Sequence, residues 1–115
     1  MRKLSLGLIL LCCSSIAVAQ GISVHGLGHN TCGEAMQQIS RTGPTTETAY
    51  TDWLGGFITG YNAAISDTKK IDSRVGVGLS FDTLTAIFKN KCGQDATKLV
   101  IQAAKEIYQE LGKRQ

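Results

Sequence analysis

The feature that most constrains this chain is a pair of cysteines that lies behind an apolar N-terminal leader. The chain begins with a short positive segment, continues with an apolar run over residues 4–18, and has an Ala-Val-Ala sequence that ends at Ala19. This pattern is typical of a cleavable secretory signal peptide, which we predict over residues 1–19. Cleavage would leave only two of the four cysteines, Cys32 and Cys92. In an oxidising compartment, we expect these two to form a disulfide.

A lipoprotein leader is the alternative, with the lipid attached to Cys12 or Cys13. Cys12 follows the bulky Leu11, and neither cysteine has the small residue before it that lipoprotein processing usually needs. The apolar run is also shorter than the roughly 20 residues that a transmembrane helix requires. We therefore favour the cleaved signal peptide and expect no membrane insertion after its removal.

The size and charge of the mature chain limit its function. Removal of 19 of the 115 residues leaves 96, which is enough for one domain with a single core. The formal net charge is +3, but two of the cations, Arg2 and Lys3, lie in the leader, so the mature charge is near +1. The remaining Lys and Arg residues are scattered. Nucleic-acid binding needs a denser basic face, so we expect no nucleic-acid partner.

Two helices are indicated in the first half of the mature chain. Thr31 and Glu34 have the spacing of a capping box, in which each side chain accepts a hydrogen bond from the other residue's backbone N–H. We expect this helix to stop at Gly43, before Pro44. The following stretch has apolar residues at helical spacing, which predicts one amphipathic helix. Its apolar positions are Tyr50, Trp53, Leu54, Phe57, Ile58, Tyr61 and Ile65.

The second half of the chain predicts two more helices after a connection over residues 66–79. One should run from an N-cap at Ser80 to a stop at Gly93, and the last from an N-cap at Asp95 to a stop at Gly112. The inner positions of the last helix are Leu99, Val100, Ala103, Ile107 and Leu111.

The domain organisation follows from these elements. We predict a flexible N-terminal tail over residues 20–30 and a helical domain over residues 31–115. No comparable stretch shows the alternating pattern of a strand. The predicted fold class is all-α, a small bundle of about four helices stapled by one disulfide.

Glycines interrupt the second predicted helix. An interior glycine costs a helix about 1 kcal/mol relative to alanine. Gly56, Gly60 and Ala64 recur at a spacing of four and form a smooth track. Two interpretations stay open: the track packs tightly against another helix of the bundle, or it forms, with Trp53, Phe57 and Tyr61, a contact surface for another protein.

A metal site and a catalytic site are both disfavoured by the sequence. His25, His29 and Cys32 have a spacing that could suggest zinc ligands. Zinc would need Cys32 as a free thiolate, however, which competes with the disulfide. No phosphate-binding loop, dinucleotide fingerprint or nucleophile–base arrangement is apparent. We therefore expect a non-enzyme without catalytic residues, metal or cofactor.

The chain resembles a family of small periplasmic proteins. The segment 31–35, Thr-Cys-Gly-Glu-Ala, and Cys92 before a last amphipathic helix resemble the HdeA family. The segment 53–62 is similar to the W-L-x-G-x-x-x-G-x-N stretch of related periplasmic proteins, including the Rap/Tai immunity proteins of type VI secretion. The resemblance covers most of residues 30–112. It implies an all-helical domain with a Cys32–Cys92 disulfide in the periplasm of a Gram-negative bacterium, and a possible homodimer.

Two functions are compatible with these observations. The first is a protein-binding module, such as an immunity-type or inhibitor protein that blocks a toxin or effector. The second, implied by the resemblance to HdeA, is an acid-stress chaperone that holds unfolded client proteins. Protonation of the carboxylates near pH 4 would give the bundle a large positive charge and loosen it by self-repulsion. We favour the protein-binding module.

Overall fold

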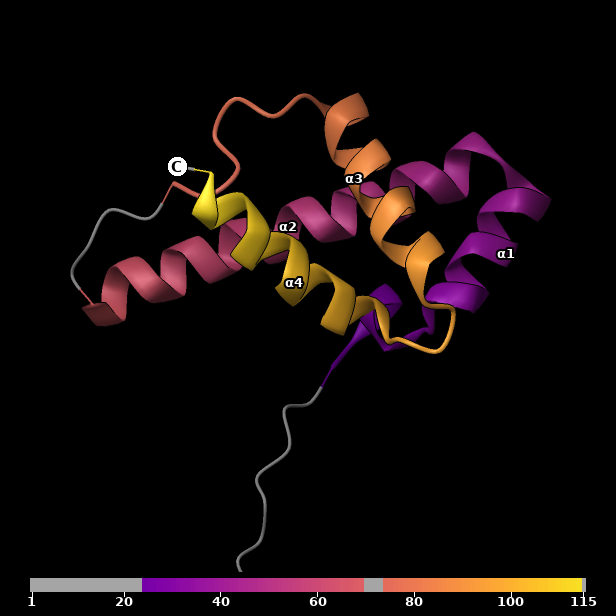
Figure 1. The fold of residues 1–115 in the computed structure, drawn as a ribbon, viewed down its shortest axis with the longest axis horizontal. Coiled ribbons are helices and arrows are strands. Elements are labelled where there is room, and N and C mark those ends of the chain that lie inside the picture. The colour runs from indigo at the N-terminus through magenta and orange to yellow at the C-terminus, as the bar shows by residue number, and fades with distance from the viewer. Residues whose placement is uncertain (1–23, 70–73, 115) are drawn as a thin grey trace, which may run out of the picture.

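Helices form most of the part of the chain that the structure describes (Figure 1). The computed structural model describes residues 24–69 and 74–114. Within these ranges it contains a short 3-10 turn and four α-helices, and no strand. The elements are η1 (Gly26–His29), α1 (Cys32–Thr42), α2 (Pro44–Lys69), α3 (Phe81–Gln94) and α4 (Val100–Lys113). The predicted all-α class is confirmed, whereas the predicted signal peptide lies outside the described residues.

Helix α1 begins at the predicted capping box. The backbone N–H of Glu34 donates to Thr31 Oγ1 at 3.1 Å, and the N–H of Thr31 donates to Glu34 Oε2 at 2.7 Å. The helix ends at Gly43, whose φ of +69° is the left-handed conformation that favours glycine. Pro44 then starts α2, where its missing N–H costs nothing because the first helical N–H groups have no intrahelical partner.

Helix α2 is longer than predicted. Its 26 residues span about 39 Å at a rise of 1.5 Å per residue, and its C-terminal part extends beyond the other helices (Figure 1). The predicted connection over residues 66–79 is therefore wrong at its start, since the helix continues to Lys69. Asp67 and Lys69 are exposed to solvent. A helical segment that is exposed to solvent does not require apolar residues, so the polar residues here do not end the helix.

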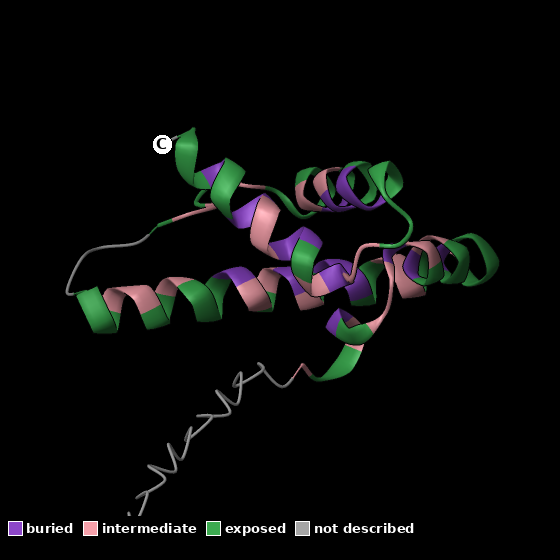
Figure 2. Ribbon diagram, turned by 60° about the horizontal axis from the view of Figure 1, so that its bottom comes forward, coloured by how far each residue is buried: buried purple, intermediate pink, exposed green. Residues whose placement is uncertain are grey.

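The hydrophobic core lies where α1, α3 and α4 meet the first half of α2 (Figure 2). The rings of Tyr50 and Phe88 stack there with their centroids 5.4 Å apart. Thr51 and Thr85, which are also buried, share a hydrogen bond of 2.8 Å between α2 and α3. The buried apolar residues are Cys32, Ala35, Ile39, Tyr50, Leu54, Ile58, Phe88, Cys92, Val100, Ala103, Ala104, Ile107, Tyr108 and Leu111.

The predicted N-cap of the last helix is wrong. Helix α4 begins at Val100, and the N–H of its N-cap Leu99 donates to the side chain of Gln102 at 3.0 Å. Asp95 instead accepts hydrogen bonds from the N–H and hydroxyl of Thr97. The segment before α4 stays non-helical because its carbonyl groups serve α1. The N–H of Cys32 donates to the carbonyl of Lys98 at 2.7 Å, and the N–H of Gly33 donates to the carbonyl of Ala96 at 2.9 Å.

The remaining helix ends lie close to their predictions. Ser80 is the N-cap of α3, as predicted, and accepts a hydrogen bond from the N–H of Thr83 at 3.1 Å. Helices α3 and α4 each end one residue after the predicted glycine stop, at Gln94 and Lys113.

The described part of the predicted tail packs against the bundle. Residues 26–29 form η1, and Gly28 is buried. A Cβ atom on Gly28 would lie 2.2 Å from Trp53 Cζ2, so only glycine allows this close approach. Asn30 follows, and its side chain donates to the hydroxyl of Tyr50 at 2.7 Å. Residues 24–30 are thus a packed segment, which the glycine content alone did not reveal.

Candidate protein-binding surface

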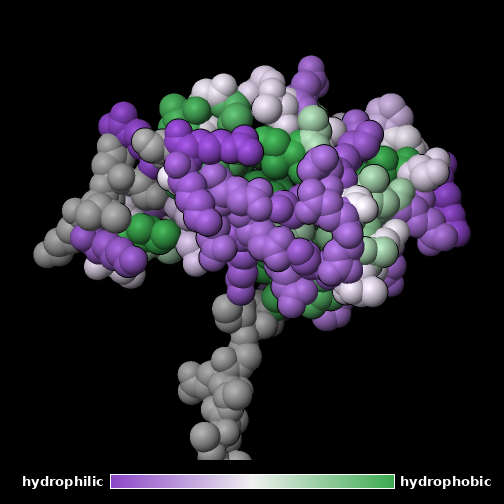
Figure 3. Space-filling view, in the orientation of Figure 1, coloured by the Kyte–Doolittle hydropathy of each residue, from purple (hydrophilic) through white to green (hydrophobic). Residues whose placement is uncertain are grey.

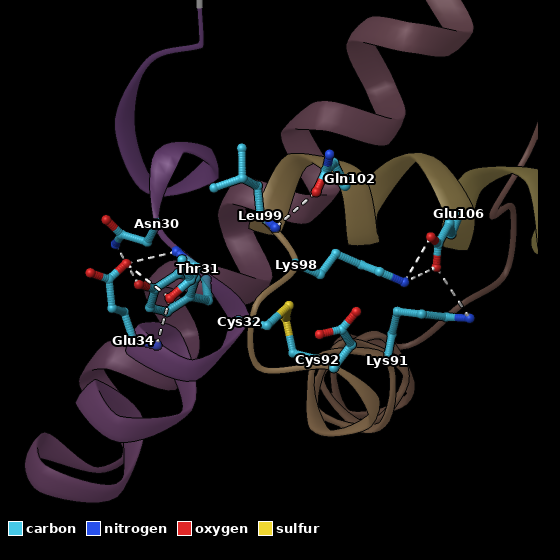
Figure 4. Close-up of a disulfide and its surroundings, with 12 residues drawn as sticks. Asn30, Thr31, Cys32, Glu34, Lys91, Cys92, Lys98, Leu99, Gln102 and Glu106 are labelled. Atoms are coloured by element: carbon cyan, nitrogen blue, oxygen red, sulfur yellow. Dashed lines mark hydrogen bonds and ion pairs between the residues drawn. A yellow bond between two sulfur atoms is a disulfide. The ribbon is translucent and has the colours of Figure 1, made fainter.

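The predicted disulfide joins Cys32 in the first turn of α1 to Cys92 in the last turn of α3 (Figure 4). Both residues are buried, and their Cα atoms are 4.8 Å apart. The sulfur of Cys32 is therefore not a thiolate that could bind zinc together with His25 and His29. Within residues 24–69 and 74–114, no group of three or more His, Cys, Asp or Glu side chains could hold a metal ion.

Three aromatic residues of α2, Trp53, Phe57 and Tyr61, form a continuous ladder. The ring centroids of Trp53 and Phe57 are 5.8 Å apart, and those of Phe57 and Tyr61 are 5.5 Å apart. Tyr61 also contacts Tyr108 of α4, with the centroids 4.6 Å apart and the rings tilted by 54°. Residues four apart lie on one side of a helix, which brings these side chains together.

The two ends of this ladder differ in exposure. Gly26 and Gly28 lie against the indole of Trp53, which is half-buried. Trp53 therefore holds η1 in place, and its predicted role as a partner-binding residue stays a prediction. Phe57 is half-buried. Tyr61 has 41% of its surface exposed and is the member of the ladder most accessible to a partner.

Gly56 and Gly60 face solvent. A Cβ atom added at either position would have no atom of the described residues within 4 Å. The interpretation that these glycines allow tight packing against another helix of the bundle is therefore wrong for the four described helices. Gly55, not part of the predicted track, is the glycine that faces a neighbouring helix, with its ideal Cβ 3.7 Å from Leu84 Cδ2.

Small residues extend this exposed surface along α2. We call it the outer face of α2, and it consists of Ala49, Asp52, Gly56, Gly60, Ala63 and Ala64, all of which are exposed. Asp52 is its one charged residue. Tyr61 borders this face, so the structure brings together three of the five predicted contact residues (Gly56, Gly60 and Tyr61) at an accessible surface.

Tyr108 is a site residue that the sequence interpretation missed. Its hydroxyl donates to Asn62 Oδ1 at 2.6 Å, and the amide of Asn62 donates to the carbonyl of Val75 at 3.0 Å. Tyr108 follows Ala104 by four residues and lies on a second inner stripe of α4 beside the predicted one. A search for two adjacent stripes would have found it.

A groove lies between α2 and α4 next to Tyr61. It has a volume of about 320 Å³ and is lined by Tyr61, Ile65, Lys105, Tyr108, Gln109 and Gly112. We call it the α2–α4 groove.

Ion pairs join α4 to α3 and to the segment before α4, on a different side of α4 from the groove. Lys91 is buried and pairs with Glu110 at 2.5 Å. Lys98 pairs with both carboxylate oxygens of Glu106 at 2.7 Å (Figure 4). The hydrogen bond from Lys91 lowers the pKa of Glu110. Figure 3 shows a broad hydrophilic surface over α4. The charge on this side is thus largely compensated within the chain.

Comparisons of the chain with protein-family models, with curated proteins and with solved structures find no match. None of the described helices is both long and apolar enough to span a membrane.

Proposed function

We propose that this chain is an exported, periplasmic protein-binding module of the immunity or inhibitor type, which contacts its partner protein through the outer face of α2. The observation that carries this proposal is the exposure of Gly56 and Gly60. Each glycine costs α2 about 1 kcal/mol, and no packing within the described residues offsets that cost. A partner protein whose backbone packs closely against the helix would explain why these two positions carry no side chain.

Tyr61 supports the same surface. It borders the outer face with 41% of its area exposed, and its ring is held between Phe57 and Tyr108. A partly exposed tyrosine with a fixed ring loses little conformational freedom on binding, and tyrosine is enriched among residues that dominate interface energetics.

The proposed location depends on the leader and agrees with the disulfide. The Cys32–Cys92 bond is stable in oxidising compartments and rare in the cytoplasm. The apolar leader supports export, and the resemblance to periplasmic proteins supports the periplasm as the destination.

The test is survival of the producing bacterium under attack. A deletion strain should be killed by toxin-armed siblings, and wild-type protein should restore survival. Gly60→Leu should fail to restore it, because the side chain would fill the proposed contact surface. Gly93→Leu is the matched control, since the ideal Cβ of Gly93 in α3 likewise has no described atom within 4 Å, and it should restore survival. Normal survival of the deletion strain, or full protection by Gly60→Leu, would contradict the proposal.

A second candidate function, the acid-stress chaperone, is favoured by one observation. Hydrogen bonds lower the pKa of three native carboxyl groups, those of Glu34, Asp95 and Glu110. The folded state is therefore favoured by their ionised forms and loses this stabilisation as acid protonates them. A chaperone of this kind should suppress aggregation of a client protein at about pH 2–3, below the ordinary carboxyl pKa values. Absence of suppression there would exclude it.

A further inference from the structure

We propose that the α2–α4 groove receives one apolar side chain of the partner protein together with a carboxylate next to it. This inference rests on the proposed function, because it identifies the part of the partner that this chain recognises. Four properties of the groove support it: its lining, its size, the rigidity of its walls and its charge.

The lining and the size suit a single side chain. Tyr61, Ile65 and Tyr108 supply aromatic and aliphatic walls, and the volume is about 320 Å³. Ligand pockets range from about 300 to 1,000 Å³, so this groove is at the small end of the range. Gly112 lines the groove without adding a side chain that would fill it.

The walls are held in place before any partner binds. The hydroxyl of Tyr108 is bound to Asn62, which in turn holds the carbonyl of Val75. The ring of Tyr61 packs on that of Tyr108 at 4.6 Å. Because these side chains are already ordered, a ligand would pay little entropy to arrange them.

The charge of the groove favours an anionic group on the ligand. Lys105, which is half-buried, lines the groove, and none of the described residues that line it is acidic. Other lysines of α3 and of the segment before α4 have partners: Lys89 pairs with Glu47, Lys91 with Glu110 and Lys98 with Glu106. Lys105 pairs with no carboxylate among the described residues. A carboxylate of the partner protein at the rim of the groove would pair with Lys105. The apolar side chain next to that carboxylate would then occupy the groove.

The test uses NMR of the uniformly 15N-labelled full mature chain with two blocked tetrapeptides. The probe is acetyl-Gly-Phe-Asp-Gly-amide, and its neutral counterpart has Asn in place of Asp. We expect the amide signals of Tyr61, Lys105 and Tyr108 to shift, and the Asp peptide to bind about fivefold more tightly than the Asn peptide, as one partly exposed ion pair allows. Shifts located elsewhere, or none at millimolar peptide, would overturn the proposal.

Two variants test whether Lys105 binds the carboxylate of the Asp peptide. Lys105→Gln should abolish the preference for the Asp peptide while the apolar contact persists. Lys113→Gln, which removes a charge from the same helix outside the groove lining, should retain the preference. A preference that survives in Lys105→Gln would overturn the role of this lysine and with it the proposal.

Two other results would assign the groove to a different occupant. Tighter binding of decanoate than of the Asp peptide would indicate a fatty acid and overturn the proposal. Groove signals that shift when the protein alone is diluted would indicate a second copy of this chain, and would also overturn it. If the deletion strain is sensitive to toxin but the peptide does not bind the groove, this inference fails and the proposed function stands.

Discussion

Replacing both exposed glycines of α2 with alanine should raise stability and reduce function at the same time. The perturbation is Gly56→Ala combined with Gly60→Ala. Each alanine should stabilise the helix by about 1 kcal/mol, because the added methyl group meets no atom of residues 24–69 and 74–114 within 4 Å and neither glycine has a positive φ. The pair should therefore add about 2 kcal/mol to the free energy of unfolding. For a domain of this size, that corresponds to a rise in Tm of about 8–16 °C.

The assay is denaturant unfolding of the oxidised mature protein, followed by circular dichroism. The midpoint should increase while the m-value stays unchanged, since the surface exposed on unfolding is the same. Gly93→Ala should also stabilise, because Gly93 is likewise in a helix and its added methyl group would meet no described atom within 4 Å. Only the α2 variant should protect a deletion strain less well against toxin. A double variant that is less stable than wild type would refute the reasoning about packing, and one that is more stable but fully protective would refute the role of the outer face.

Three further predictions concern the fold. Gly28→Ala places a Cβ 2.2 Å from Trp53 Cζ2, so η1 must move; stability should fall by about 1–3 kcal/mol, and the fluorescence of the single tryptophan should change, whereas an unchanged spectrum would count against the contact. Reduction of the Cys32–Cys92 bond, which closes a sequence separation of 60, should lower the free energy of unfolding by about 4 kcal/mol, measured by urea unfolding with and without reductant; equal midpoints would contradict this. The pKa of Glu110 is lowered from its ordinary value of 4.5, so its ionised form stabilises the fold above that pH, and the effect is lost as the pH falls through the lower folded-state value. Glu110→Gln should therefore flatten the acid side of the plot of unfolding free energy against pH. An unaltered slope would argue against this contribution.

The parts of the fold that depend on local chemistry could be predicted from the sequence. The capping box at Thr31, the helix N-cap at Ser80 and the glycine stop at Gly43 are determined by residues within a few positions of each other. The disulfide could be predicted because only one cysteine pair lies beyond the predicted leader. These features need no knowledge of how distant segments pack.

The parts of the fold that depend on long-range contacts could not be predicted from the sequence. Asp95 has the chemistry of an N-cap, but α4 starts later because the preceding segment pairs with α1. Gly28 looks like a residue of a flexible tail until its contact with Trp53, 25 positions away, is seen. The helical pattern likewise places Gly56 and Gly60 on one side of α2, but it does not show whether another helix covers that side.

Site-specific photo-cross-linking in the producing bacterium tests most directly whether the outer face of α2 contacts a partner protein. A benzophenone amino acid would replace Ala63 on the outer face, and in a parallel strain Ser40, which is exposed on α1. Irradiation under attack by toxin-armed siblings should give one discrete protein adduct from position 63, identified as the toxin by mass spectrometry, and none from position 40. Absence of an adduct at position 63 in a strain that is protected, or the same adduct from position 40, would contradict the assignment of this surface.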